Sequence, residues 1–122
     1  MNSNKASVFL IIIFSFVIIS CAYVKKDVVQ IPCTIADSVT YTKDIAPIIQ
    51  TNCFQCHSGT SNISGILLES YTELKFYADN GYLYGTLSHS SGFIPMPDGG
   101  TKLNDCTIST IKKWIDTGTP EN

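Results

Sequence analysis

The stretch Thr51–Gly59, TNCFQCHSG, carries two cysteines three positions apart and a histidine directly after the second. Cysteines with this spacing serve three kinds of site: a redox dithiol, half of a zinc site, or the covalent attachment point of a haem. The residues around the stretch and the compartment of the protein distinguish between them.

A redox dithiol stands at the start of a helix within a βαβ unit. The residues before the motif, 42–52, instead predict a short helix, with Asp44 as its N-cap and Pro47 in its first turn. Its apolar face consists of isoleucines at spacings of 3 and 4, namely Ile45, Ile48 and Ile49. No alternating strand precedes the motif, so a redox dithiol is disfavoured.

A zinc site needs four ligands, and here Cys106 would have to join Cys53, Cys56 and His57. The adjacent Cys56 and His57 do not easily occupy two corners of one tetrahedron. Haem attachment explains every position: each thiol adds to one vinyl group, and the imidazole of His57 becomes the proximal iron ligand. The motif therefore favours one covalently bound haem c held by Cys53, Cys56 and His57.

Residues 1–20 predict an export signal, and export is what c-type haem attachment requires. The apolar run Val8–Ile19 would cover about 18 Å as a helix, short of the roughly 30 Å hydrocarbon core of a bilayer. The following Ser20 and Cys21 complete a stretch that resembles the lipobox of bacterial lipoproteins. This resemblance implies a lipid anchor on Cys21 in the periplasm or cell envelope. A plain cleaved signal and an uncleaved anchor are the alternatives.

The rest of the chain is expected to form a tether over 21–40 and one small domain over 41–122. The formal net charge is −2, from eight lysines, no arginine and ten acidic residues. Without a basic surface, nucleic-acid binding by phosphate neutralisation is not expected.

Five cysteines in an exported protein leave two to be explained after Cys21, Cys53 and Cys56. In an oxidising compartment the remaining Cys33 and Cys106 are expected to form a disulfide. Two buried, reduced thiols are the alternative.

The chain resembles the class I, single-haem cytochrome c family from about Tyr41 to Pro120. Besides the haem motif, three stretches carry this resemblance: Tyr41, Asp44, Ile45, Pro47 and Ile48; Met96, Pro97, Gly99, Lys102 and Leu103; and Trp114 and Ile115. The resemblance implies an all-α cytochrome c fold, with three to five short helices wrapped around the haem.

Met96 is the predicted distal ligand, because it lies between Pro95 and Pro97 in a stiffened loop and at the position that the family uses. Ligation by His and Met raises the reduction potential. His89, seven residues earlier, is the rival ligand. The sequence also leaves open an empty distal position, or a core-filling role for Met96.

Three further helices are expected after the motif. The first begins with a capping box at Ser70 and Glu73 and stops at Asn80 and Gly81. The second is short and is indicated by Leu83 and Leu87, which lie four positions apart. The closing helix is capped by Asn104 or Asp105 and is ended by Gly118 and Pro120. Trp114 is expected to pack in the core against the first helix.

The expected function is electron transfer by a lipid-anchored monohaem cytochrome rather than enzymatic catalysis. Its partners would be redox proteins and, through Cys21, a membrane. The alternative is a haem-based sensor or small-molecule binder, or the haem subunit of a larger oxidoreductase complex, with an open or His-ligated distal site.

Overall fold

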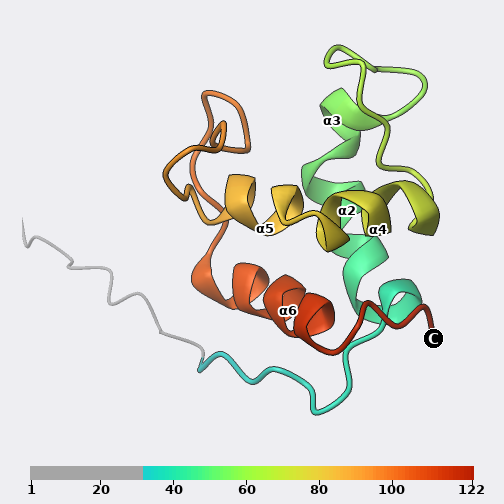
Figure 1. The fold of residues 1–122 in the computed structure, drawn as a ribbon, viewed down its shortest axis with the longest axis vertical. Coiled ribbons are helices and arrows are strands. Elements are labelled where there is room, and N and C mark those ends of the chain that lie inside the picture. The colour runs from blue at the N-terminus through green and yellow to red at the C-terminus, as the bar shows by residue number, and fades with distance from the viewer. Residues whose placement is uncertain (1–31) are drawn as a thin grey trace, which may run out of the picture. The chain divides into compact units, whose positions relative to one another are not determined.

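The computed structural model describes residues 32–122 of the chain. The predicted signal peptide and the predicted lipidation site, Cys21, lie outside the described residues. Residues 32–122 form one unit that contains helices and no strand. The all-α class expected from the sequence is therefore confirmed for this part of the chain (Figure 1).

Six helical elements follow one another in the described part. They are the π-helical turn η1 (Tyr41–Ile45), α2 (Ala46–Asn52), α3 (Phe54–His57), α4 (Tyr71–Asp79), α5 (Tyr82–Leu87) and α6 (Asp105–Asp116). Between residues 32 and 122, no helix has the length and apolar character needed to cross a membrane.

The first helical element begins earlier than the sequence predicted. Asp44 lies inside η1 rather than before a helix, and its Oδ2 accepts a hydrogen bond from the Thr40 N–H at 2.9 Å. The predicted N-cap role of Asp44 was therefore wrong, because the turn starts at Tyr41 and the carboxylate reaches back to its beginning. Pro47 lies in the first turn of α2, as expected, where its missing N–H leaves no bond unmade.

The other helix signals are confirmed. The Glu73 N–H donates to Ser70 Oγ at 3.2 Å, and the Ser70 N–H donates to Glu73 Oε2 at 2.9 Å, which completes the capping box of α4. Asn104, not Asp105, caps α6, since its Oδ1 accepts from the Thr107 N–H at 2.9 Å.

One core joins the helices. Its buried members are Val39, Ile45, Ile49, Leu68, Leu74, Ala78, Leu83, Leu87, Ile111 and Trp114. Trp114 is fully buried, its indole N–H donates to the Pro120 carbonyl at 2.9 Å, and the Tyr41 ring of η1 lies 6.3 Å from it. The expected packing of this tryptophan against the start of the domain is confirmed.

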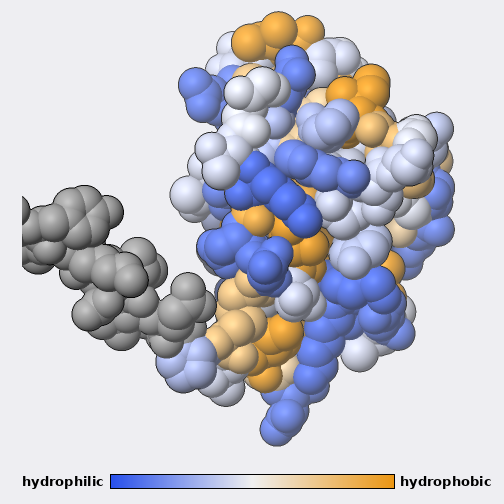
Figure 2. Space-filling view, turned by 90° about the vertical axis from the view of Figure 1, so that its left-hand side faces the viewer, coloured by the Kyte–Doolittle hydropathy of each residue, from blue (hydrophilic) through white to orange (hydrophobic). Residues whose placement is uncertain are grey.

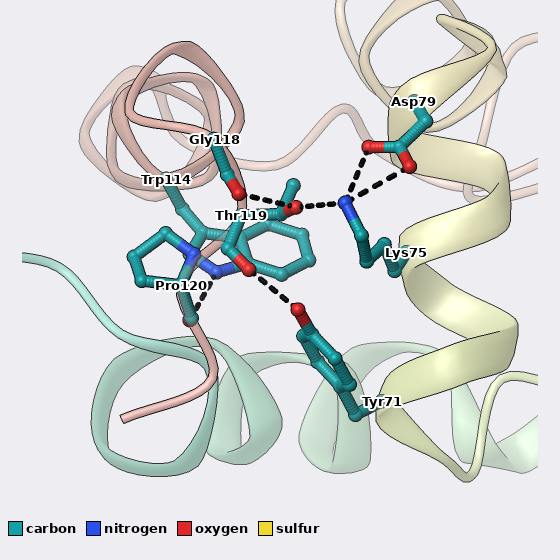
Figure 3. Close-up of polar contacts among 7 residues, drawn as sticks. All are labelled: Tyr71, Lys75, Asp79, Trp114, Gly118, Thr119 and Pro120. Carbon is teal, nitrogen blue, oxygen red and sulfur yellow. Dashed lines mark hydrogen bonds and ion pairs between the residues drawn. The ribbon is translucent and has the colours of Figure 1, made fainter.

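Polar contacts tie the residues after α6 to α4 (Figure 3). The Tyr71 hydroxyl donates to the Thr119 carbonyl at 2.8 Å, and the Lys75 ammonium contacts the Thr119 hydroxyl at 2.5 Å. Lys75 also pairs with Asp79, 2.9 Å away. Thr119 is itself only 1% exposed. The residues after α6 are therefore held against α4 by hydrogen bonds.

A cross-link joins the residues before η1 to α6. The sulfur atoms of Cys33 and Cys106 lie 2.02 Å apart, at bonding distance, although 73 positions separate the two residues in the sequence. The structure thus brings together the pair expected from the cysteine count. The unit begins at Pro32, so it includes the last part, 32–40, of the segment expected as a tether, where Val39 is buried.

Candidate functional site

Cys53, Cys56 and His57 come together in one turn of the chain between α2 and the end of α3. The carbonyl of Cys53 accepts hydrogen bonds from the N–H groups of Cys56, at 3.1 Å, and His57, at 2.9 Å. Both cysteines are free; Cys53 is partly buried and Cys56 is exposed. One short helical turn therefore presents two unpaired thiols and an imidazole.

Two oxygen atoms surround one nitrogen of the His57 ring. Nδ1 lies 3.1 Å from the Ile66 carbonyl oxygen and 2.9 Å from the Ser64 hydroxyl. A carbonyl oxygen can only accept, so this contact favours the tautomer in which Nδ1 carries the proton and Nε2 of the neutral ring keeps its lone pair. Metal-binding histidines in proteins are commonly held in this way, with one nitrogen donating to a carbonyl and the other facing the metal.

The loop after the motif folds back to hold this arrangement. The Leu68 N–H donates to the His57 carbonyl at 3.0 Å, and the Ile63 N–H donates to the Cys56 carbonyl at 3.2 Å. Farther along, the carboxylate of Glu69 accepts from the Gly59 N–H at 2.9 Å. Loop 58–69 therefore folds back onto one side of the motif turn and places the Ile66 carbonyl beside the imidazole.

The state of Cys53 bears on the redox-dithiol alternative. Burial raises the pKa of this thiol to about 11. Cysteines that take part in thiol-disulfide exchange have a lowered pKa, because the thiolate is the nucleophile. A thiol that stays protonated at neutral pH is poorly suited to attack a disulfide, so burial disfavours Cys53 as the nucleophile of an exchange site.

The zinc alternative would require Cys106 as a fourth ligand. The sulfur of Cys106 is instead bonded to Cys33, so it is not free to coordinate a metal. Among residues 32–122, no group of three or more histidine, cysteine or acidic side chains has the arrangement of a metal site. The disulfide is the observation that argues against zinc.

Met96 lies in the loop between α5 and α6. Its side chain is partly buried and packs against the same core as Cys53 and Ile66. Its N–H donates to the Thr86 carbonyl, near the end of α5, at 3.1 Å. In Figure 1 this loop and α3 lie at the same end of the folded unit.

His89 is exposed, and its ring contacts the backbone of the predicted distal ligand. Nε2 lies 3.0 Å from the Met96 carbonyl oxygen. From the sequence, His89 was either the rival ligand or a polar residue near the haem edge or at the surface, and its exposure agrees with a surface position. The sequence gave no signal for the contact with Met96, because the contact depends on how the loop turns between the two residues.

A cavity of about 430 Å³ lies next to the loop that holds His57. Its lining is mostly apolar and aromatic and consists of Gly65, Ile66, Leu67, Thr72, Glu73, Phe76 and Tyr77. Ile66 belongs to this lining and also supplies the carbonyl that accepts from His57. The side chains of the motif and of Met96 do not line the cavity.

The segments that flank the site carry almost no charge. Residues 58–68 and 81–97 contain no aspartate, glutamate, lysine or arginine. Two isoleucines in these segments are unusually exposed, Ile63 at 82% and Ile94 at 70%. Figure 2 shows the side of the molecule that lies on the left in Figure 1, where hydrophobic patches stand among hydrophilic residues.

No family model, curated protein or solved structure matches this chain. The interpretation of the site therefore depends on its own residues and their contacts. Those contacts place two free thiols and an imidazole held through Nδ1 within one turn. This donor set fits covalent haem attachment better than a redox dithiol or a zinc site.

Proposed function

We propose that this chain is a monohaem c-type cytochrome that carries electrons. The observation that carries the proposal is the hydrogen bond from His57 Nδ1 to the Ile66 carbonyl, beside two free thiols at the spacing of haem attachment. With Nδ1 as the donor, Nε2 of the neutral ring keeps the lone pair with which a histidine binds iron.

Each residue of the site has a defined part in this proposal. Cys53 and Cys56 would hold the haem through thioether bonds, His57 would be the proximal ligand and Met96 the distal one. A haem c bound there would supply an iron that alternates between the ferrous and ferric states. The apolar core beneath Cys53 and Met96 would keep water away, and ligation by Met and His favours a raised potential.

The proposed role is that of a carrier rather than an enzyme. If His57 and Met96 fill both axial positions, no coordination position remains for a substrate. The role would require a partner surface instead, and the uncharged segments 58–68 and 81–97 suit contact through apolar side chains such as Ile63 and Ile94. We expect the partners to be redox proteins.

The place of action proposed is the periplasm or cell envelope, with the chain exported by residues 1–20 and tethered by a lipid on Cys21. The support for this is the apolar run and the cysteine that follows it. The disulfide geometry of Cys33 and Cys106 is consistent with an oxidising compartment.

The test is a redox titration with optical spectra of protein purified after expression with a haem-attachment system. We expect haem that organic solvent does not extract from the denatured chain, a methionine-to-iron charge-transfer absorption in the ferric form, and one reversible one-electron step. The matched variants Cys53→Ala and Cys56→Ala should each retain a single thioether, and the double variant should lose covalent attachment.

A wild-type chain without covalently attached haem would overturn the proposal. Covalent haem that lacks the methionine absorption and binds carbon monoxide rapidly when reduced would instead establish an open distal site. The function would then be that of a haem-based sensor or small-molecule binder.

A further inference from the structure

The Met96 peptide is hydrogen-bonded at both of its polar groups. Its N–H donates to the Thr86 carbonyl at 3.1 Å, and its carbonyl oxygen lies 3.0 Å from Nε2 of His89. Because the carbonyl only accepts, Nε2 of His89 is the donor. The main chain of Met96 is therefore held in place by the end of α5 and by the residues directly after it.

The loop between His89 and Met96 is itself closed and packed. The Ser90 N–H donates to the Gly85 carbonyl at 3.0 Å, and the Phe93 ring lies so close to Gly85 that an added Cβ would meet it at 2.6 Å. The His89 side chain spans the opening of this loop and contacts its far end.

The backbone of His89 adopts an uncommon conformation. Its φ is +58°, in the left-handed region that non-glycine residues adopt infrequently. Glycine would take this conformation with less strain. Histidine is among the few side chains that adopt it comparatively often, and from this conformation the imidazole reaches the Met96 carbonyl.

We propose that His89 is a positioning residue for Met96. By holding the Met96 carbonyl, it keeps the loop in the conformation that presents the thioether as distal ligand. The inference rests on the proposed function, since it concerns Met96 as an iron ligand. In this role His89 is not itself an iron ligand, because its Nε2 donates to the Met96 carbonyl.

The matched variants His89→Gln and His89→Leu test this role in the haem-bound protein. Both place a β-unbranched side chain in the same left-handed conformation, but only glutamine has an N–H donor with the reach of Nε2. Ferric protein is titrated with imidazole, which competes with a methionine ligand, while the methionine-to-iron absorption is followed. Thermal unfolding of each variant is measured alongside.

We expect His89→Leu to bind imidazole roughly fivefold more tightly than the wild type, the equivalent of one lost hydrogen bond of about 1 kcal/mol. His89→Gln should stay within about twofold of the wild type, because it keeps the donor. A residue with a merely structural role would change the unfolding temperature and leave the imidazole affinity unchanged.

Equal imidazole affinity in the wild type and His89→Leu would overturn the positioning role and leave the proposed function standing. Equally raised affinity in both variants would overturn the hydrogen bond as its cause. If the wild type holds haem but shows no methionine absorption, ligation by Met96 and this inference are both overturned.

Discussion

The link between Cys33 and Cys106 is expected to dominate the stability of the folded unit. Substituting either cysteine by alanine removes the cross-link but little packing, since Cys33 is exposed and Cys106 is only partly buried. In the chain-entropy model, opening a loop closed across 73 positions lowers the free energy of unfolding by about 4 kcal/mol. This is a large share of the roughly 5–15 kcal/mol that stabilises a typical domain.

Unfolding in guanidinium chloride, followed by far-ultraviolet circular dichroism, measures this loss. With a slope of roughly 2 kcal/mol per molar denaturant, the midpoint should fall by about 2 M. Cys33→Ala, Cys106→Ala and the double variant should fall by the same amount, because each removes the same bond. Ser91→Ala, at an exposed position in the loop after α5, serves as the control and should match the wild type.

Two results would refute this reasoning. A loss below about 1 kcal/mol would mean that closing the loop contributes little to stability. A double variant much less stable than either single variant would mean that the thiols contribute separately, and therefore that the wild-type cysteines are not bonded to each other.

Three further predictions follow from the contacts of the described residues. Ser64→Ala removes one of the two oxygen atoms that contact Nδ1 of His57 and should weaken electron donation by the ring to the iron, so the midpoint potential in a redox titration should rise. Tyr71→Phe removes the hydrogen bond to the Thr119 carbonyl and should lower the free energy of unfolding by about 1 kcal/mol in denaturant titrations. Hydrogen bonds from Ser70 lower the pKa of Glu73 in the folded state. The stabilisation from this carboxylate is therefore complete above the usual pKa of 4.5 and is lost as pH falls through the lowered pKa. Glu73→Gln should remove this part of the pH dependence of the free energy of unfolding.

Each of these predictions has a control or a contrary outcome. Tyr82→Phe changes a tyrosine that is 58% exposed and should leave stability within about 0.5 kcal/mol of the wild type. An unchanged potential in Ser64→Ala would show that the Ile66 carbonyl alone sets how strongly His57 donates to the iron, and a lowered potential would contradict the prediction. Identical acid unfolding in Glu73→Gln and the wild type would contradict the capping role of the carboxylate.

Local signals were sufficient for most of the helices. Ser70 and Asn104 cap α4 and α6 because their side chains accept hydrogen bonds from an N–H three residues ahead, a relation that depends on nearby sequence alone. Asp44 is the exception. Its carboxylate has the same chemistry, but the turn around it begins at Tyr41, which shifts its bond to the Thr40 N–H.

The sequence by itself determined the donor set of the candidate site. The spacing of Cys53, Cys56 and His57 within one turn is a local property of the chain, and so is the choice of thiols and imidazole as donors. Only the tertiary structure decided the surroundings of those donors, namely their hydrogen-bond partners and their burial. The Ile66 carbonyl contacts Nδ1 of His57 from a loop nine residues further on, and burial raises the pKa of Cys53.

The tertiary structure also decided how the chain brings such partners together. The cysteine count predicted that Cys33 pairs with Cys106, but not the path by which a residue before η1 reaches α6, and no sequence signal predicted that His89 contacts the Met96 carbonyl across a packed loop. Contacts of this kind depend on where the core places each loop, and that is a property of the whole fold. Spacing along a chain specifies neighbours within a helical turn, whereas it leaves the path of a loop, and hence its long-range contacts, open.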